Sequence, residues 1–141
     1  MIRPLVLVVA LIALAGTAVA ACPGYESKNA YSSAESAKEA MDAMQRRIAR
    51  LYPTTGSVVA PSKGDPTYSF KLEFTPKAGS ACPKVGGAKS QERFKSYPEA
   101  VSAMSTAIAD EAANGPILAL DTFVYCIGQG VECGYSYAAF R

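Results

Sequence analysis

The chain has 141 residues and a formal net charge of +2, from 14 basic and 12 acidic side chains, and it contains no histidine. A charge this close to neutral gives no electrostatic reason to expect a nucleic acid as partner. The absence of histidine excludes Ser-His-Asp and Cys-His catalytic sites.

The N-terminal segment has the pattern of an export signal. Arg3 supplies a positive charge, an apolar run follows over residues 5–15, and small residues follow at Ala18-Val19-Ala20. This order predicts a secretory signal peptide over residues 1–20, with a single N-terminal anchor helix as the alternative. We expect residues 21–141 to form a single disulfide-bridged domain, exported from a bacterial cell to the periplasm or the medium.

The role of Cys22 can be interpreted in two ways. Val19-Ala20-Ala21-Cys22 resembles a bacterial lipobox, which would make Cys22 a lipid anchor to the envelope. An even number of cysteines in an exported chain instead favours two disulfides. We favour Cys22 with Cys82 and Cys126 with Cys133, while a pairing in which Cys22 or Cys82 reaches the other two cysteines stays open.

Two stretches of the exported part resemble each other. Each begins Ala-Cys-Pro, at Ala21 and at Ala81, and each continues through a polar loop to a Ser-x-x-Glu box, Ser32 to Glu35 and Ser96 to Glu99. Such a box is typical of a helix N-terminus, because its two side chains satisfy free backbone N–H groups. The likeness indicates an internal repeat of residues 21–75 and 81–141, although a chance resemblance between Ala- and Ser-rich segments stays open.

Apolar residues at helical spacing follow each box. The first stripe predicts a helix to about Leu51, ended by Pro53, and the second predicts a helix that stops at Asn114-Gly115-Pro116. The stripes are Ala37, Met41, Met44, Ile48 and Leu51, and Val101, Met104, Ile108 and Ala112.

After each helix the apolar period changes from that of a helix to that of a strand. Residues 57–60 and 68–75 predict one hairpin, and residues 117–126 and 131–140 predict another. In the second hairpin we expect Cys126 to face Cys133, which also aligns Val124 with Tyr135. The simplest packing of two helix–strand–strand units is an α+β fold, in which a four-stranded antiparallel sheet carries both helices on one face.

The sequence offers few groups for catalysis or metal binding. It has no Cys-x-x-Cys pair and no histidine, so we expect no metal, no cofactor and no catalytic residue. A hydrolase would need two carboxylates in one cleft, and nothing in the sequence brings together Asp65, Glu73, Asp121 and Glu132.

The segment from Pro76 to Lys95 is basic, with Lys77, Lys84, Lys89, Arg93 and Lys95 against Glu92 alone. It could contact an anionic partner or membrane surface, or could be a solvated loop.

The face of the expected sheet away from the helices is the best candidate for a binding surface. Exposed aromatic side chains bordered by charges are typical of recognition patches. The candidate residues are Lys71, Glu73, Asp121, Phe123, Tyr125 and Phe140. The alternatives are that the N-terminal loop or the basic loop covers these residues, or that the expected register is wrong. We expect a non-enzymatic binding or accessory protein, such as an inhibitor, whose partner is an unknown protein or envelope component. A lipid-anchored envelope protein and a carboxylate-dependent hydrolase are the alternatives.

Overall fold

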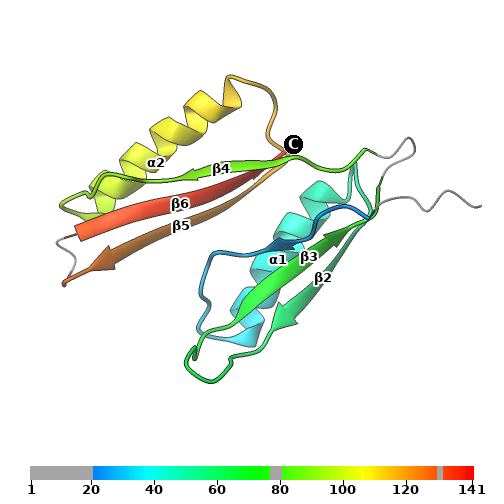
Figure 1. Cartoon of the computed structure of the whole chain (residues 1–141), viewed down its shortest axis with the longest axis horizontal. Coiled ribbons are helices and arrows are strands. Elements are labelled where there is room, and N and C mark those ends of the chain that lie inside the picture. Colours follow the sequence, from blue (N-terminus) through cyan, green and yellow to red (C-terminus); the bar gives the residue numbers. More distant parts are fainter. Residues whose placement is uncertain (1–20, 77–80, 130–131) are drawn as a thin grey trace, which may run out of the picture.

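The structure is a computed structural model that describes residues 21–76, 81–129 and 132–141. These residues form two helices and six strands (Figure 1). In chain order the elements are β1 (Tyr25–Glu26), α1 (Ala34–Ile48), β2 (Thr54–Val59), β3 (Ser69–Phe74), β4 (Val85–Lys89), α2 (Tyr97–Ala112), β5 (Ala119–Ile127) and β6 (Glu132–Phe140). The predicted signal peptide lies outside the described residues.

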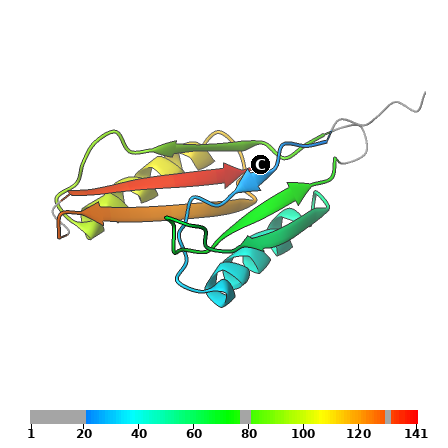
Figure 2. The ribbon, with the colours of Figure 1, turned by 60° about the horizontal axis from the view of Figure 1, so that its bottom comes forward.

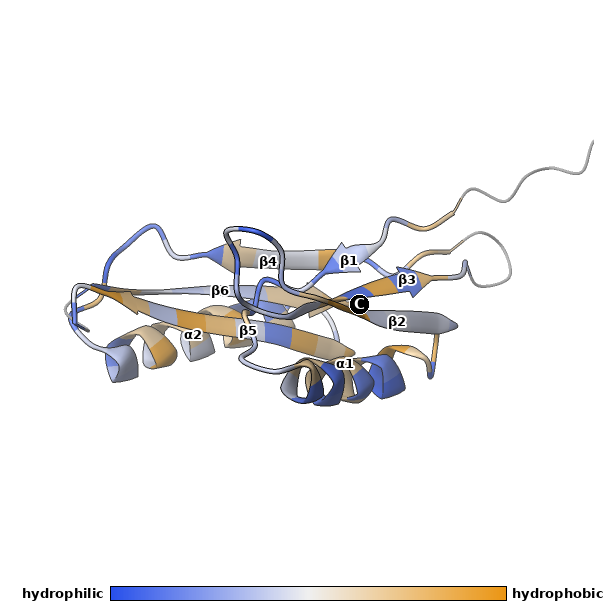
Figure 3. Cartoon of the chain, turned by 90° about the horizontal axis from the view of Figure 1, so that it is seen from below, coloured by the Kyte–Doolittle hydropathy of each residue, from blue (hydrophilic) through white to orange (hydrophobic). Residues whose placement is uncertain are grey.

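The strands form two separate three-stranded antiparallel sheets, with the orders β1-β3-β2 and β4-β6-β5. The predicted single four-stranded sheet is therefore wrong. Each unit has a strand before its helix that the sequence analysis did not predict, and this strand pairs with the last strand of the same unit. The two halves share one element order and one sheet order. Figure 3 shows both helices on the same side of the strands.

The first unit packs α1 against alternate residues of β3. Met41, Met44 and Ile48 of the helix are buried in one cluster with Phe70, Leu72 and Phe74. A side chain at Gly56 in β2 would collide with Met41, so this glycine allows the helix to approach the sheet closely. The predicted stripe is correct as far as Ile48, where α1 ends, whereas Leu51 is exposed.

Both helices begin at a serine cap, but the first box is displaced from its predicted position. Ser33, rather than Ser32, is the cap of α1, and it forms its reciprocal pair with Ser36 instead of Glu35. Ser96 caps α2 as expected by accepting from the N–H of Glu99. Two adjacent serines made the first position ambiguous, because either could satisfy a free N–H of the first turn.

The second unit contains the predicted hairpin in the predicted register. Cys126 lies opposite Cys133 and Val124 lies opposite Tyr135. The predicted turn and strand include residues 130 and 131, which lie outside the described residues. Alternation along the two strands turns one face of the sheet toward α2, where Met104 packs with Tyr137 and Ala139.

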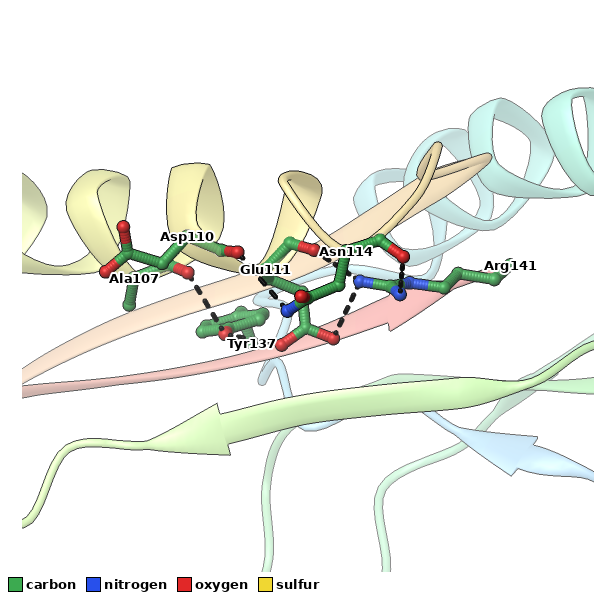
Figure 4. Close-up of polar contacts among 6 residues, drawn as sticks. All are labelled: Ala107, Asp110, Glu111, Asn114, Tyr137 and Arg141. Atoms are coloured by element: carbon green, nitrogen blue, oxygen red, sulfur yellow. Dashed lines mark hydrogen bonds and ion pairs between the residues drawn. The ribbon is translucent and has the colours of Figure 1, made fainter.

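A polar cluster fixes the end of α2 to β6 (Figure 4). The Arg141 guanidinium donates to the backbone carbonyls of Glu111 and Asn114 and lies 3.2 Å from the Glu111 carboxylate. Tyr137 donates to the same carboxylate over 3.2 Å. The last turn of α2 has no basic residue of its own. Arg141 therefore supplies the positive charge that the carbonyl end of a helix favours.

The two units share a core and a disulfide. Figure 2 shows the end of β6 beside β1. Phe140 at that end is fully buried against Tyr25 of β1, with 4.8 Å between the ring centroids. Cys22 and Cys82, which precede β1 and β4, form one disulfide, and Cys126 and Cys133 form the other. This is the expected pairing.

Candidate functional site

The structure does not gather the six residues of the predicted patch on one surface. Lys71 and Glu73 are exposed on the side of β3 away from α1, where Lys71 lies 3.9 Å from Glu26. Asp121 and Phe140 are buried, at 6% and 0% exposure. The predicted patch is therefore corrected to its remaining members, Phe123 and Tyr125, which are partly exposed and stacked on each other with centroids 5.7 Å apart.

Asp121 is buried because the first unit folds over it. Its carboxylate accepts hydrogen bonds from Tyr25 at 2.5 Å, Ser27 at 2.9 Å and Asn29 at 2.7 Å. Asn29 also donates to the backbone carbonyl of Thr122. Burial, followed by the hydrogen bond to Asp121 and its negative charge, raises the pKa of Tyr25 far above its usual range. Tyr25 therefore keeps its proton and donates a hydrogen bond to the carboxylate.

The Asp121 hydrogen bonds place the β1–α1 loop against the edge of β5. Lys28 lies in this loop between two of the residues that bind the carboxylate. Lys28, from the first unit, lines the same hollow as Phe123 of the second unit. Asp121 thus positions a basic side chain and is not itself open to a ligand.

Phe123 and Tyr125 line a hollow of about 400 Å³ on the face of the second sheet away from α2. Ser136 of the central strand lies opposite both Phe123 of β5 and Lys89 of β4. A small side chain in the middle and long ones on both outer strands leave a trough along β6. The side chains that line the hollow are Lys28, Lys89, Phe123, Tyr125 and Ser136.

Gly134 determines how Tyr125 lies in this trough. The two residues are opposite each other, and a side-chain carbon added at Gly134 would be 2.6 Å from the Tyr125 hydroxyl oxygen. The tyrosine ring therefore lies across the strand at the place where β6 has no side chain. This leaves the ring face available to cations.

Cations surround the Tyr125 ring. The Lys89 ammonium lies 5.9 Å from the ring centroid and the Arg93 guanidinium lies 5.4 Å from it. Arg93 also donates to the Tyr125 hydroxyl over 3.1 Å. With Lys28, three positive side chains border two stacked aromatic rings, and no carboxylate belongs to the described lining of the hollow. Such an arrangement is suited to an anion with an apolar or planar part.

The basic segment predicted as a loop is in part a strand. Residues 85–89 form β4, and the segment that follows runs beside β6 and is held by hydrogen bonds between Phe94 and Cys133. Lys77 lies outside the described residues. Lys89 and Arg93 belong to the predicted basic segment, but no sequence pattern places them beside Tyr125 or points to Lys28 and Ser136. An alternation of apolar and polar side chains over residues 85–89 would have indicated strand β4. Gly86 and Gly87 have no side chains, so the sequence shows no such alternation.

The other candidate chemistry is dispersed. Within the described ranges, no group of three or more His, Cys, Asp or Glu residues could hold a metal ion. Of the four carboxylates considered for a hydrolase, Asp121 is buried, whereas Asp65, Glu73 and Glu132 are exposed on other elements. None of the helices in the described part of the chain is long and apolar enough to cross a membrane.

The two disulfides hint at an oxidising setting outside the cytoplasm. Comparisons of the chain with protein-family models, curated proteins and solved structures found no match.

Proposed function

We propose that this protein is an exported, non-catalytic binding module that captures an anionic partner in the hollow between Lys89, Phe123 and Tyr125. The observation that carries the proposal is the stacked aromatic pair bordered by three cations. Lysine and arginine supply permanent positive charge, and the aromatic faces supply apolar contact area. Together these groups favour binding an anion over transforming a substrate.

The surroundings of the hollow support a preorganised site. The Cys126–Cys133 disulfide ties the two strands together directly beside Tyr125. The hydrogen bonds of Asp121 hold the loop that carries Lys28. A surface that is ordered before binding loses less conformational entropy when the partner arrives.

The alternatives have less support. A lipid on Cys22 would occupy the sulfur atom that is bonded to Cys82 in this structure. A carboxylate-dependent hydrolase would need two acidic side chains together, and the hydrogen bonds of Asp121 come from Tyr25, Ser27 and Asn29. We therefore propose a soluble protein of the periplasm or medium.

The experiment measures binding of three labelled anionic probes to residues 21–141 by fluorescence anisotropy. The probes are a peptide that alternates glutamate with valine, heparin and polyphosphate. The test variants are Lys89→Glu and Phe123→Ala. The matched control is Lys63→Glu, which makes the same charge change at an exposed turn position.

We expect at least one probe to bind at low salt, and its affinity to fall as ionic strength rises. Lys89→Glu should weaken that binding about tenfold or more, because a repulsive charge replaces an attractive one, whereas Lys63→Glu should have little effect. The proposal is wrong if no probe binds, or if both test variants bind as well as the control.

A further inference from the structure

The hollow is continuous with an unpaired edge of the second sheet. Strand β4 pairs with β6 on one side and forms the outer edge of the β4-β6-β5 sheet on the other. All five residues of β4 are exposed. Edge strands with accessible backbone are templates on which another extended chain can pair.

The register shows which backbone groups face outward. Lys84 exchanges two backbone hydrogen bonds with Arg141, and Ser90 donates to the carbonyl of Tyr135. Hydrogen-bonded positions alternate along an antiparallel strand, so Val85, Gly87 and Lys89 direct their N–H and C=O groups toward the free edge. The same alternation puts the Lys89 side chain on the face of the hollow.

Other sheet edges in the described chain are less suitable. The outer edge of β5 is met by the first unit, where Asn29 donates to the carbonyl of Thr122. Strand β2 is also an edge strand, but its sequence TTGSVV contains no charged residue. Strand β1, the remaining edge strand of the described residues, has only two residues. Strand β4 combines an accessible backbone, in which Gly86, Gly87 and Ala88 carry almost no side chain, with a neighbouring basic hollow.

We propose that the anionic partner is an extended acidic segment of another protein, which pairs its backbone with the free edge of β4 and directs acidic side chains toward Lys89 at the rim of the hollow. This inference rests on the proposed function. Charge complementarity selects the occupant: Lys84 directly precedes β4, Lys89 ends it, and Arg93 follows. The same charges oppose pairing with the β4 edge of a second copy of this chain, because both edges would carry a net positive charge.

Backbone pairing would give the partner affinity, and alternate side chains would give it specificity. Adjacent strands lie about 4.8 Å apart, so an added strand would turn every second side chain to the face that carries Lys89 and bring the one opposite Lys89 close to it. The expected ligand is therefore a segment in which acidic residues recur at every second position. A polyanion without peptide N–H groups would use the hollow but not the edge.

The test compares three forms of the peptide that alternates glutamate with valine. One is unmodified, and two are N-methylated at every second residue, each on a different edge of the extended peptide. N-methylation removes a backbone donor without changing the charge of the peptide. We expect methylation of one edge to weaken binding about tenfold or more, and methylation of the other edge to leave the affinity within about twofold of the unmodified peptide.

Amide hydrogen exchange gives an independent result on the protein side. Binding of the unmodified peptide should slow exchange at Gly87 and Lys89, whose N–H groups face the free edge, and leave β2 unchanged. Equal binding of all three peptides, with Lys89→Glu still weakening each of them, would overturn backbone pairing and leave the proposed function intact. If heparin or polyphosphate binds and the peptide does not, the inference that the partner is an acidic protein segment is overturned, and the proposed anion binding remains. Failure of every probe would overturn both proposals.

Discussion

Replacement of Asp121 should show how strongly the two units depend on their polar contact. The carboxylate is 6% exposed and accepts hydrogen bonds from Tyr25, Ser27 and Asn29. A hydrogen bond to a charged group contributes about 1.5–3 kcal/mol, and part of the sum is offset by the cost of burying the charge. We expect Asp121→Ala to lower the free energy of unfolding by about 3–5 kcal/mol, because three hydrogen bonds to a charged group are lost and only part of their sum is offset.

Asp121→Asn is the matched comparison. Its carbonyl can still accept from Asn29, and its amide can donate to the hydroxyl oxygens of Tyr25 and Ser27, so we expect a smaller loss of about 1–2 kcal/mol. The assay is urea unfolding of residues 21–141, followed by circular dichroism. A double-mutant cycle with Tyr25→Phe should give a coupling energy of about 1 kcal/mol or more. Losses below about 1 kcal/mol for Asp121→Ala, or no coupling with Tyr25, would refute this reasoning.

Two further predictions concern the disulfides and alkaline pH. Cys22 and Cys82 are 60 residues apart, so replacing both by alanine should lower the free energy of unfolding in urea by about 4 kcal/mol. Cys126 and Cys133 are only 7 residues apart, so the same replacement there should lower it by about 2 kcal/mol. An equal or larger loss for the Cys126–Cys133 disulfide would contradict this dependence on loop length. The pKa of Tyr25 is raised in the folded state, so the unfolded state loses the Tyr25 proton at a lower pH than the folded state does. The free energy of unfolding should therefore fall as the pH rises above about 10, and Tyr25→Phe should lessen that fall in urea unfolding measured at several pH values. The same fall with pH in Tyr25→Phe as in the wild type would show that Tyr25 does not cause it.

Local patterns in the sequence were sufficient to predict the helices and the second hairpin. The register of Cys126 with Cys133 followed from one requirement, that the cysteines and the core residues share a face. Both disulfides then followed by elimination, and the structure contains both. These features depend on residues close in sequence or on a fixed alternation.

The sheets could not be predicted in the same way. Strand β1 has only two residues, and β4 reads Val-Gly-Gly-Ala-Lys, so neither carries an apolar alternation. Both are held by backbone hydrogen bonds to the last strand of their unit, a contact that no local pattern reports. With β1 and β4 missing from the prediction, the simplest packing of the two predicted hairpins was a single four-stranded sheet.

The six residues of the predicted patch do not share one open surface, for a related reason. Alternation correctly placed Asp121, Phe123, Tyr125 and Phe140 on one face of the sheet. It could not show that the first unit covers the end with Asp121 and Phe140 and leaves the end with Phe123 and Tyr125 open. Which part of a face is covered depends on contacts between residues far apart in the sequence, such as Tyr25 with Phe140.

The most direct test of the proposed anion-binding hollow is to map where an anionic probe binds the wild-type protein. The measurement is a two-dimensional NMR titration of residues 21–141 with the peptide that alternates glutamate with valine, and with heparin in a parallel sample. The account predicts shift changes concentrated at Lys28, Lys89, Phe123 and Tyr125 for whichever probe binds. Shift changes centred on the exposed face of β3 around Lys71, or no shift changes with the peptide and none with heparin, would contradict binding in the hollow.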